Sequence, residues 1–367
     1  MRIVLATDAW TPQINGVVTT LKATAAQLSA LGHEVRMIHP QGLWCMPCPS
    51  YPEIRLALAP GAHVARELTA FAPHAIHVAT EGPVGMAVRR YCHARGVPFT
   101  SSYHTHYPEY LRARWPIPLA LTYAWLRGFH NAAARTFVSS PTLEAQLGGQ
   151  GFRRLHRWRR GVDLKRFHPD ARAHRLLQGL PRPLMACVGR LAVEKNLDAF
   201  LALKVPGTKL VIGDGPHRAS LEARHPQARF LGFRTGAELT ELLGGVDVLV
   251  FPSLTDTFGI AMIEALACGV PVAAFPVPGP LDVIEPGVTG VLHADLATAI
   301  AGALRLDRRV CAERAHGFSW DAATAQVLAG LAPVPPGLRA RLAVSRSSAM
   351  IARIAARRQP SQAGDAN

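Results

Sequence analysis

No run of apolar residues in this chain of 367 residues approaches the roughly 18 that a membrane-spanning helix requires. The apolar run near the N-terminus, Ile3–Ala6, is much shorter than the hydrophobic segment of a secretory signal peptide and is typical of a buried strand. We therefore expect a cytoplasmic protein. Disorder is excluded by composition, because 49% of the residues are hydrophobic and only 18% are charged.

Cysteine is also scarce, and its spacing predicts neither a metal site nor a redox site. Cys45 and Cys48 form a C-x-x-C, but no second cysteine pair or histidine pair completes a zinc site. The prolines around this pair predict a loop rather than the strand and helix of a redox motif. The other four cysteines are scattered singly, as expected of buried thiols in a reducing compartment.

Acidic residues are outnumbered, which leaves a formal net charge of +15 and an isoelectric point near 10.3. Such a charge favours an anionic partner, which is a nucleic acid, a membrane surface or a phosphorylated substrate. Composition alone does not choose among the three. The basic residues cluster at 112–115, 153–160 and 339–358, with tryptophan inside the first two clusters.

Short β-rich runs alternate with helical patterns in both halves of the chain, which predicts two α/β domains with parallel sheets. A segment at 160–169 interrupts the alternation and is interpreted as an interdomain linker. The cleft between two such domains is the expected ligand site. Expected strands lie at 3–6, 35–38, 75–79, 98–102, 136–138, 184–188, 209–212, 229–231, 246–251 and 270–274. Expected helices lie at 17–31, 62–71, 83–95, 119–134, 141–148 and 260–267, and others begin near 195, 217, 237 and 319.

The most informative segment is 252–272, where a predicted buried strand leads through a glycine turn into a helix. The free N–H groups at the start of that helix form an anion site. Asp256 precedes the turn, and Glu264 follows about two helical turns later on the same side. One acid is then placed for sugar hydroxyls and the other for a ribose diol. The alternative is an ordinary strand–turn–helix with a capping aspartate. The turn residues are Thr257, Phe258 and Gly259.

Two further turns carry groups suited to a diphosphate. Arg190 and Lys195 follow Gly189 and leave the carboxyl edge of the sheet together, where a diphosphate requires two cations. Basic residues on a surface loop are the alternative. The next predicted strand ends in a turn with Gly213 and Gly215. No G-x-G-x-x-G motif occurs there or near the N-terminus, so nicotinamide or flavin binding has little support.

These three blocks, in this order and spacing, resemble the family-4 glycosyltransferases of the GT-B fold over roughly residues 1–333. The resemblance implies two facing, doubly wound Rossmann-like domains with an interdomain cleft. The acceptor-binding domain would be 1–165 and the nucleotide-sugar-binding domain 166–333. The remainder, 334–367, is a basic tail that we expect to be partly disordered.

The resemblance also implies roles for single residues. In the family the block 256–264 is an E-x7-E motif, whose first acid is replaced here by Asp256 and whose second, Glu264, binds the nucleotide ribose. Arg190 and Lys195 match the pair that grips the diphosphate and stabilises the leaving group. The implied donor-binding residues are Asn15, Gly16, Gly189, Gly213, Gly215, Thr257, Phe258, Gly259 and Glu264. The implied catalytic residues are His104, Arg190, Lys195 and Asp256.

The N-terminal half agrees with the resemblance. Asn15 and Gly16 lie in a segment similar to the family's glycine-rich first loop, with Asn15 in place of the first glycine of a common pair. His104 aligns with the active-site histidine that faces the transferred sugar. His106, two residues later, makes no metal site without further ligands. No D-x-D occurs, which argues against the metal-dependent GT-A class, and we expect no metal or other cofactor.

The segments 6–18, 102–110 and 157–163 are most similar to one subgroup of the family. It contains bacterial diacylglycerol glycosyltransferases, sulfoquinovosyl-lipid synthases and GDP-mannose-dependent α-mannosyltransferases. The resemblance implies retaining transfer of a hexose from a UDP- or GDP-sugar to a membrane glycerolipid such as diacylglycerol. It also implies front-face attack, with a donor phosphate oxygen accepting the proton of the acceptor.

A lipid acceptor fits the basic clusters and places the protein at the anionic inner face of the cell membrane. The segment 110–127 mixes apolar, aromatic and basic residues suited to such an interface, and a core helix with terminal arginines is the alternative. Three other functions stay open. They are transfer to a soluble or polysaccharide acceptor, epimerisation of the donor, and nucleic-acid binding, for which no recognition motif is present.

Overall fold

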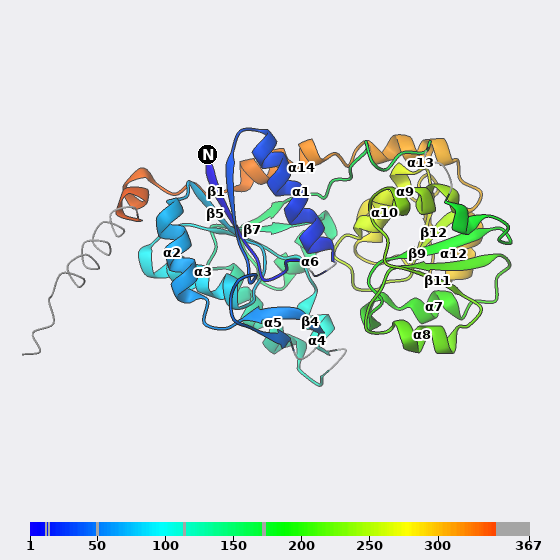
Figure 1. Ribbon diagram of the computed structural model, residues 1–367, viewed down its shortest axis with the longest axis horizontal. Coiled ribbons are helices and arrows are strands. Elements are labelled where there is room, and N and C mark those ends of the chain that lie inside the picture. The colour runs from blue at the N-terminus through cyan, green and yellow to red at the C-terminus, as the bar shows by residue number, and fades with distance from the viewer. Residues whose placement is uncertain (12, 14, 49–50, 113–114, 171–173, 343–367) are drawn as a thin grey trace, which may run out of the picture.

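Two parallel six-stranded sheets, one in each half of the chain, form the framework of the molecule. The computed structural model describes residues 1–11, 13, 15–48, 51–112, 115–170 and 174–342. Figure 1 shows the two sheets in separate lobes that lie side by side, with helices packed around each. The predicted α/β class is therefore confirmed, and both halves contain the parallel sheet that the alternating pattern predicts.

The first lobe has the strand order β2-β1-β5-β6-β7-β8. Its strand β1 is apolar on both faces, as expected of a parallel strand that helices cover on both sides. Ile3, Val4 and Leu5 of β1 accordingly expose at most 1% of their surface. The strands are β1 (Arg2–Ala6), β2 (Glu34–Ile38), β5 (Ala75–Val78), β6 (Thr100–Ser102), β7 (Arg135–Val138) and β8 (Leu155–Arg157). The helices are α1 (Gly16–Ala30), α2 (Gly61–Phe71), α3 (Pro83–Arg95), α4 (Tyr107–Arg112), α5 (Leu119–His130) and α6 (Pro141–Gly149).

The second lobe has the order β11-β10-β9-β12-β13-β14. Its topology changes direction at β9, which lies between β10 and β12, and the carboxyl ends of strands at such a switch point are where ligands bind. The strands are β9 (Leu184–Val188), β10 (Thr208–Ile212), β11 (Arg229–Gly232), β12 (Val248–Phe251), β13 (Val272–Ala274) and β14 (Gly290–Leu292). The helices are α7 (Leu197–Leu201), α8 (Arg218–Arg224), α9 (Gly236–Gly245), α10 (Ile260–Ala267), α11 (Pro280–Val283), α12 (Leu296–Ala303) and α13 (Arg308–Ala315).

The last long helix, α14 (Trp320–Gly330), returns the chain to the first lobe. Its buried Ala323 and Val327 share a core cluster with strand β1 and helix α1. The backbone N–H of Val162 also donates to Phe318 O at 2.8 Å, so the two crossings between the lobes run side by side. Helix α14 lies within the range 166–333 that we assigned to the second domain, yet it packs on the first sheet.

Gly330 provides a test of this packing. A Cβ atom at this position would lie 2.5 Å from both Phe137 Cζ and His156 Cδ2. We expect Gly330→Ala to lower the free energy of unfolding by about 1–3 kcal/mol, the usual cost of overpacking a filled core. Chemical denaturation measures this change. Gly128→Ala in α5 is the matched control, because its added methyl meets nothing within 4 Å and a helical alanine gains about 0.5–1 kcal/mol over glycine. Equal stability of the two variants would contradict the packing described.

Two local predictions are wrong. Cys45–Cys48 is not a loop but strand β3, which pairs antiparallel with β4 (Tyr51–Ala57). A two-stranded sheet accepts the intervening proline, since each strand keeps one unpaired edge. The helix expected from residue 195 starts at Leu197, after the 3-10 turn Val193–Lys195. Of the predicted tail, only residues up to 342 are described, and Val334 and Leu342 pack on the first lobe.

Candidate active site

Two glycine turns, at the carboxyl ends of β9 and β10, pack against each other, and the first of them lines a pocket. Gly189 N–H donates to Ile212 O at 3.0 Å, and Leu191 N–H donates to Asp214 O at 2.9 Å. A Cβ atom on Gly213 would lie 1.9 Å from Gly189 O, so no other residue fits without moving the turn. Gly213 and Gly215 thus act by letting the two turns meet backbone to backbone.

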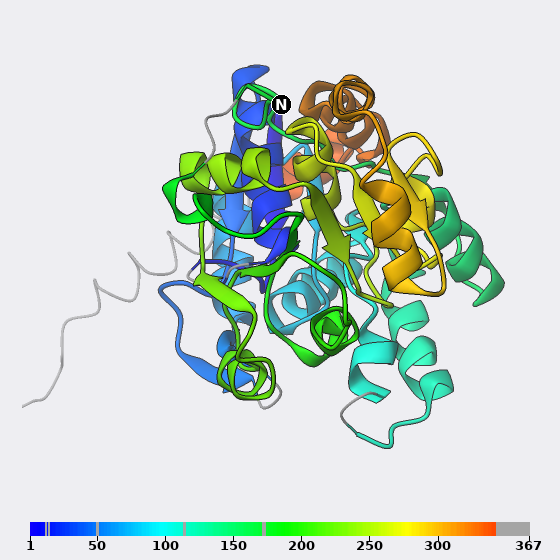
Figure 2. The same ribbon diagram turned by 90° about the vertical axis from the view of Figure 1, so that its right-hand side faces the viewer.

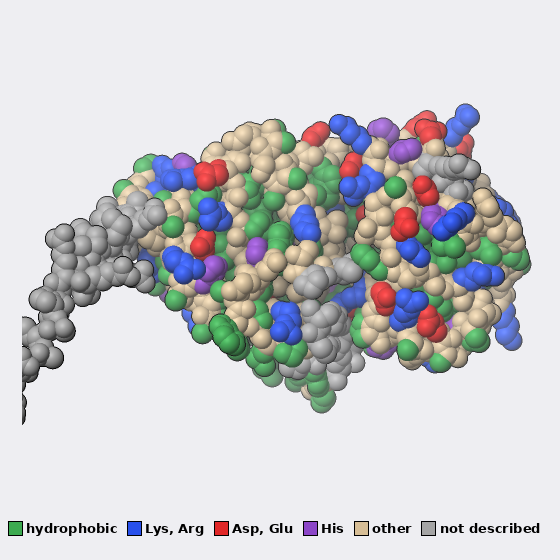
Figure 3. All heavy atoms as spheres, in the orientation of Figure 1, with side chains coloured by type: hydrophobic (Ala, Val, Ile, Leu, Met, Phe, Trp, Pro, Cys, Tyr) green, Lys and Arg blue, Asp and Glu red, His purple; other side chains and the backbone are tan. Residues whose placement is uncertain are grey.

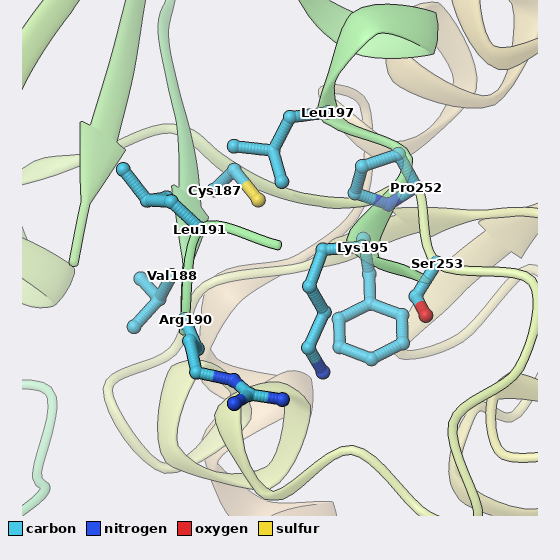
Figure 4. A pocket seen from close by; sticks show the side chains of 10 residues that line it. Cys187, Val188, Arg190, Leu191, Lys195, Leu197, Pro252 and Ser253 are labelled. Carbon is cyan, nitrogen blue, oxygen red and sulfur yellow. The ribbon is translucent and has the colours of Figure 1, made fainter. Parts of the chain in front are cut away.

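The pocket receives two cations from the turn after β9. Figure 4 shows Arg190 and Lys195 extending in the same direction on one side of this pocket, which Phe251 and Ser253 also line. Arg190 Nη2 donates to Glu194 Oε1 at 2.8 Å, and the Glu194 side chain is only 3% exposed. The sequence therefore predicted correctly that the two basic side chains leave this edge together.

Lys195 is bound directly to Asp256. Its Nζ lies 2.8 Å from both carboxylate oxygens of Asp256, and both side chains are largely buried. We predicted a diphosphate contact for the lysine and a sugar contact for the aspartate, and did not predict the bond between them. An anion entering this pocket would share Lys195 with Asp256, so the position of the aspartate is coupled to anion binding.

The turn into α10 places Thr257, Phe258 and Gly259 between Asp256 and the helix. Gly259 has φ = 88°, a left-handed conformation in which glycine carries no side-chain penalty. Phe258 is buried at 4% exposure and anchors the turn in the core of the second lobe. The free N–H groups at the start of α10 are consequently held in place beside the Lys195–Asp256 pair.

Glu264 lies one turn further into α10, and burial raises the pKa of its carboxyl to about 7. The positive charge of Arg166 acts in the opposite direction and is the weaker effect. A carboxyl in such a setting is stabilised in its charged form by neighbouring hydroxyl donors. Glu264 is therefore suited to accept two hydrogen bonds from a diol.

The first lobe faces this turn with its own loop. Asn15 caps α1, since its side-chain Oδ1 accepts from the N–H groups of Val17 and Val18 at 3.1 and 3.0 Å. A Cβ atom on Gly16 would lie 3.5 Å from Cδ1 of Ile260, the first residue of α10. Asn15 and Gly16 thus lie opposite the start of α10, whereas Pro12 and Ile14 of the same motif lie outside the described residues.

Hydrogen bonds through Thr257 join the loop of His104 in the first lobe to the turn before α10 in the second. Thr257 Oγ1 donates to His104 O at 2.8 Å, and Ser139 Oγ donates to Thr257 O at 2.7 Å. A third bridge between the lobes joins the hydroxyl of Thr142 to Asp282 at 2.8 Å. The structure therefore brings His104 of the first lobe to the turn 256–259 of the second, which is called the donor turn below.

Two residues in this region escaped the sequence analysis. Glu194 holds Arg190. Because Arg190 lies in a loop and Glu194 in a 3-10 turn, the i, i+4 spacing, which indicates a contact only on a helix, gave no signal for this pair. Tyr110 of α4 reaches the second lobe. Burial raises its phenol pKa well above the usual value, and the carboxylates of Asp256 and Glu194 add to the effect. Tyr110 lies in two segments that the sequence analysis singled out, 102–110 and 110–127, but its contact with the second lobe was not predicted, because the contact arises only when the lobes meet.

Metal chemistry has no evident ligand set in this region. Over residues 1–342, apart from the undescribed positions, no group of three His, Cys, Asp or Glu side chains is arranged to hold a metal ion. The cations of the site are the side chains of Arg190 and Lys195.

Sequence comparisons match both halves of the chain. Residues 14–166 match the family model described as Glycosyltransferase Family 4, and residues 182–306 match that described as Glycosyl transferases group 1. A GDP-mannose-dependent alpha-mannosyltransferase of Mycobacterium tuberculosis is 33% identical over 315 residues, which are 80% of this chain and 83% of that protein. A GDP-mannose-dependent alpha-(1-6)-phosphatidylinositol dimannoside mannosyltransferase of the same species is 30% identical over 90% of this chain and 96% of its own length.

Solved structures show the same fold. Sucrose-phosphate synthase from Thermosynechococcus elongatus superposes with a TM-score of 0.70 at 22% identity, over 89% of this chain and 97% of that one. Together with the two sheets and the facing lobes, this likeness identifies the architecture as GT-B.

Proposed function

This chain belongs to the family-4 glycosyltransferases of the GT-B fold, and on that premise we propose that it transfers a hexose, with retention, from a nucleotide sugar to a membrane glycerolipid. The observation that carries the proposal is that Arg190 and Lys195 line one pocket and that Lys195 is bound to Asp256, which lies in the turn that leads into α10, the helix that contains Glu264. Two cations and a helix N-terminus are the usual means of holding a diphosphate.

The donor is held mainly by the second lobe. Glu264 accepts hydrogen bonds from the ribose diol, while Arg190 and Lys195 bind the diphosphate beside the glycine turns that follow β9 and β10. GDP-mannose is the first donor to test, because the two relatives named above depend on it. UDP-hexoses are the second class.

The reaction itself depends on stabilising the departing nucleoside diphosphate. As the glycosidic bond to phosphate breaks, negative charge grows on the diphosphate, and Lys195 and Arg190 are already aligned with it. Asp256 is a poor nucleophile, because Lys195 neutralises its carboxylate at 2.8 Å. We infer that the acceptor hydroxyl attacks the hexose from the same face from which the leaving group departs. An oxygen of the departing phosphate takes the proton of that hydroxyl.

The acceptor binds to the first lobe, residues 1–165, and is a lipid such as diacylglycerol. Trp115, Ile117, Leu121 and Trp125 of the segment 110–127 are 37–65% exposed, and Figures 1 and 2 show that α4 and α5 protrude at the lower edge of this lobe. Apolar side chains gather at this edge in Figure 3. None of the helices described here has the length and hydropathy of a transmembrane span. A protruding apolar and aromatic edge is suited to shallow insertion in a bilayer.

A transfer assay tests the proposal. Purified protein is incubated with radiolabelled GDP-mannose, UDP-glucose, UDP-galactose or UDP-glucuronate, with and without diacylglycerol in anionic vesicles. We expect label in the lipid phase from one donor, and an α-linked product by NMR. Label transferred only to a soluble or polymeric glycan would contradict the lipid acceptor, and a β-linked product would contradict retention.

Two substitutions at the lower edge of the first lobe separate membrane binding from donor binding. We expect Leu121→Ser and Trp125→Ser each to weaken binding to anionic vesicles about tenfold, since each removes a side chain worth roughly 1.5 kcal/mol on burial. Nucleotide affinity is unchanged. Leu31→Ser is the control, because Leu31 is 58% exposed in the same lobe and 65% of Leu121 is exposed. Vesicle co-sedimentation measures the effect, and equal binding by all three variants would place the membrane contact elsewhere.

A further inference from the structure

Arg160 is a buried arginine in the segment that follows β8, and its hydrogen bonds go to neutral acceptors. Only 4% of it is exposed. Its Nη1 donates to Trp158 O at 2.9 Å, its Nη2 lies 2.9 Å from His104 Nδ1, and its guanidinium stacks 4.4 Å from the centre of the Trp158 ring. Burial lowers the pKa of Arg160 to about 9, so it stays cationic at neutral pH.

The contact between Arg160 and His104 determines where the imidazole proton lies. A guanidinium has only donors, so Nδ1 of His104 must accept and carries no proton. The neutral ring then carries its proton on Nε2. A second proton would have to enter on Nδ1, against the guanidinium and at the expense of this hydrogen bond.

The remaining nitrogen, Nε2, is a buried donor without a partner. It makes no hydrogen bond to any described group. A buried polar atom without a partner is uncommon and often marks a functional position. The residue as a whole is partly exposed, and its carbonyl is bound to Thr257 in the donor turn. A hexose attached to a diphosphate held beside that turn would therefore lie near the loop that carries this ring.

The titratable groups around His104 all disfavour its cationic form. They are Arg160 after β8, His77 on β5 and His130 at the end of α5. Burial is the largest cause and these groups follow, and together they lower the pKa of His104 well below its ordinary value. Carboxylates are not among the groups that shift it.

We propose that Arg160 is a positioning residue, which keeps the proton of His104 on Nε2 so that this nitrogen donates a hydrogen bond to a hydroxyl of the transferred hexose. The inference rests on the proposed function for its substrate, while the tautomer itself stands on the geometry alone. His104 in this arrangement neither takes up nor releases a proton during transfer. Its contribution is a fixed neutral donor.

Two-bond proton–nitrogen NMR of protein labelled with ¹⁵N-histidine tests the tautomer without any substrate. The His104 signal is assigned from its loss in His104→Asn. We expect a neutral ring protonated on Nε2, with no titration between pH 6 and 8, and a shift of that proton on addition of GDP-mannose. An Nδ1-protonated ring, or titration in this range, would overturn the proposal whether or not the protein transfers sugar.

Two variants of Arg160 separate positioning from packing. Arg160→Met removes the donor to Nδ1, and we expect His104 to populate both tautomers and the pH profile of kcat/KM to gain a new limb. We also expect kcat/KM to fall about tenfold, the effect of losing one neutral hydrogen bond, here that from His104 Nε2 to the hexose. Arg160→Gln keeps an amide donor without the charge and should retain the Nε2 tautomer and more of the activity. Equal losses in both variants with an unchanged His104 spectrum would show that Arg160 serves packing only.

Discussion

Replacement of Lys195 by alanine is expected to lower kcat/KM for hexose transfer by about 10³-fold, the effect of removing one preorganised group from the site where charge develops. Lys195 is the group that would meet the diphosphate as it leaves. It is also the partner of Asp256 at 2.8 Å, so its removal leaves a carboxylate facing that diphosphate. Loss of attraction and gain of repulsion therefore act in the same direction.

The two contributions separate in a double mutant. Asp256→Asn in the Lys195→Ala background removes the repulsion, and we expect it to recover about tenfold of the lost activity. Asp256→Asn alone lowers activity, because it weakens the contact with the sugar and loosens Lys195. The control is Lys204→Ala, an exposed lysine of the same lobe. Initial rates at saturating and limiting donor measure the series. Transfer by Lys195→Ala within threefold of the unmodified protein would contradict this role.

Glu264→Gln is expected to have opposite effects on donor binding and on stability. At pH 8 the carboxylate accepts two charge-assisted hydrogen bonds from the ribose, and the amide accepts only one neutral bond. We expect nucleotide affinity to fall about 10–100-fold. The unliganded variant is nevertheless more stable at this pH, since it no longer buries a charge.

The pH dependence follows from the pKa of Glu264, which burial raises from 4.5 to about 7. Between these values the folded protein binds the proton more tightly than the unfolded chain, so stability falls as pH rises through this window. Glu264→Gln removes the fall, and we expect a gain of about 1–3 kcal/mol at pH 8 and little change near pH 5.

Nucleotide binding by the unmodified protein should vary in the other direction with pH. Affinity rises about tenfold from pH 6 to pH 8 as Glu264 ionises, and is flat in Glu264→Gln. Calorimetric titration at three pH values measures this, alongside thermal unfolding. Glu313→Gln, at an exposed position of α13, is the control. If the nucleotide affinity of Glu264→Gln rose with pH as it does in the unmodified protein, this result would contradict a contact between Glu264 and the ribose.

Much of the fold was predictable because its signals are local. Parallel strands covered on both faces are short apolar runs. The predicted bounds of the strand at 184–188 and of the helix at 260–267 agree with those of β9 and α10. Ser319 was expected near the start of the last helix, and its hydroxyl does accept from Ala322 N–H. Glycine turns and caps depend on a few neighbouring residues, so sequence alone specifies them.

What sequence reading missed depends on contacts between distant segments. The bond of Lys195 to Asp256 joins two turns 61 residues apart, and each residue taken singly suggested a different partner. The packing of α14 on the first sheet depends on Gly330 meeting Phe137 and His156 across the chain. Arg160 was recognised only as part of a basic cluster, because its burial and its contact with His104 arise from the assembled lobe.

A crystal structure with GDP-mannose or a UDP-hexose bound, whichever donor transfers, tests the central claim most directly. The account predicts the diphosphate within hydrogen-bond distance of Arg190, Lys195 and the start of α10, the ribose diol on Glu264, and a hexose hydroxyl on His104 Nε2. A nucleotide bound to the first lobe, or one that leaves Glu264 and Lys195 without contact, would contradict it.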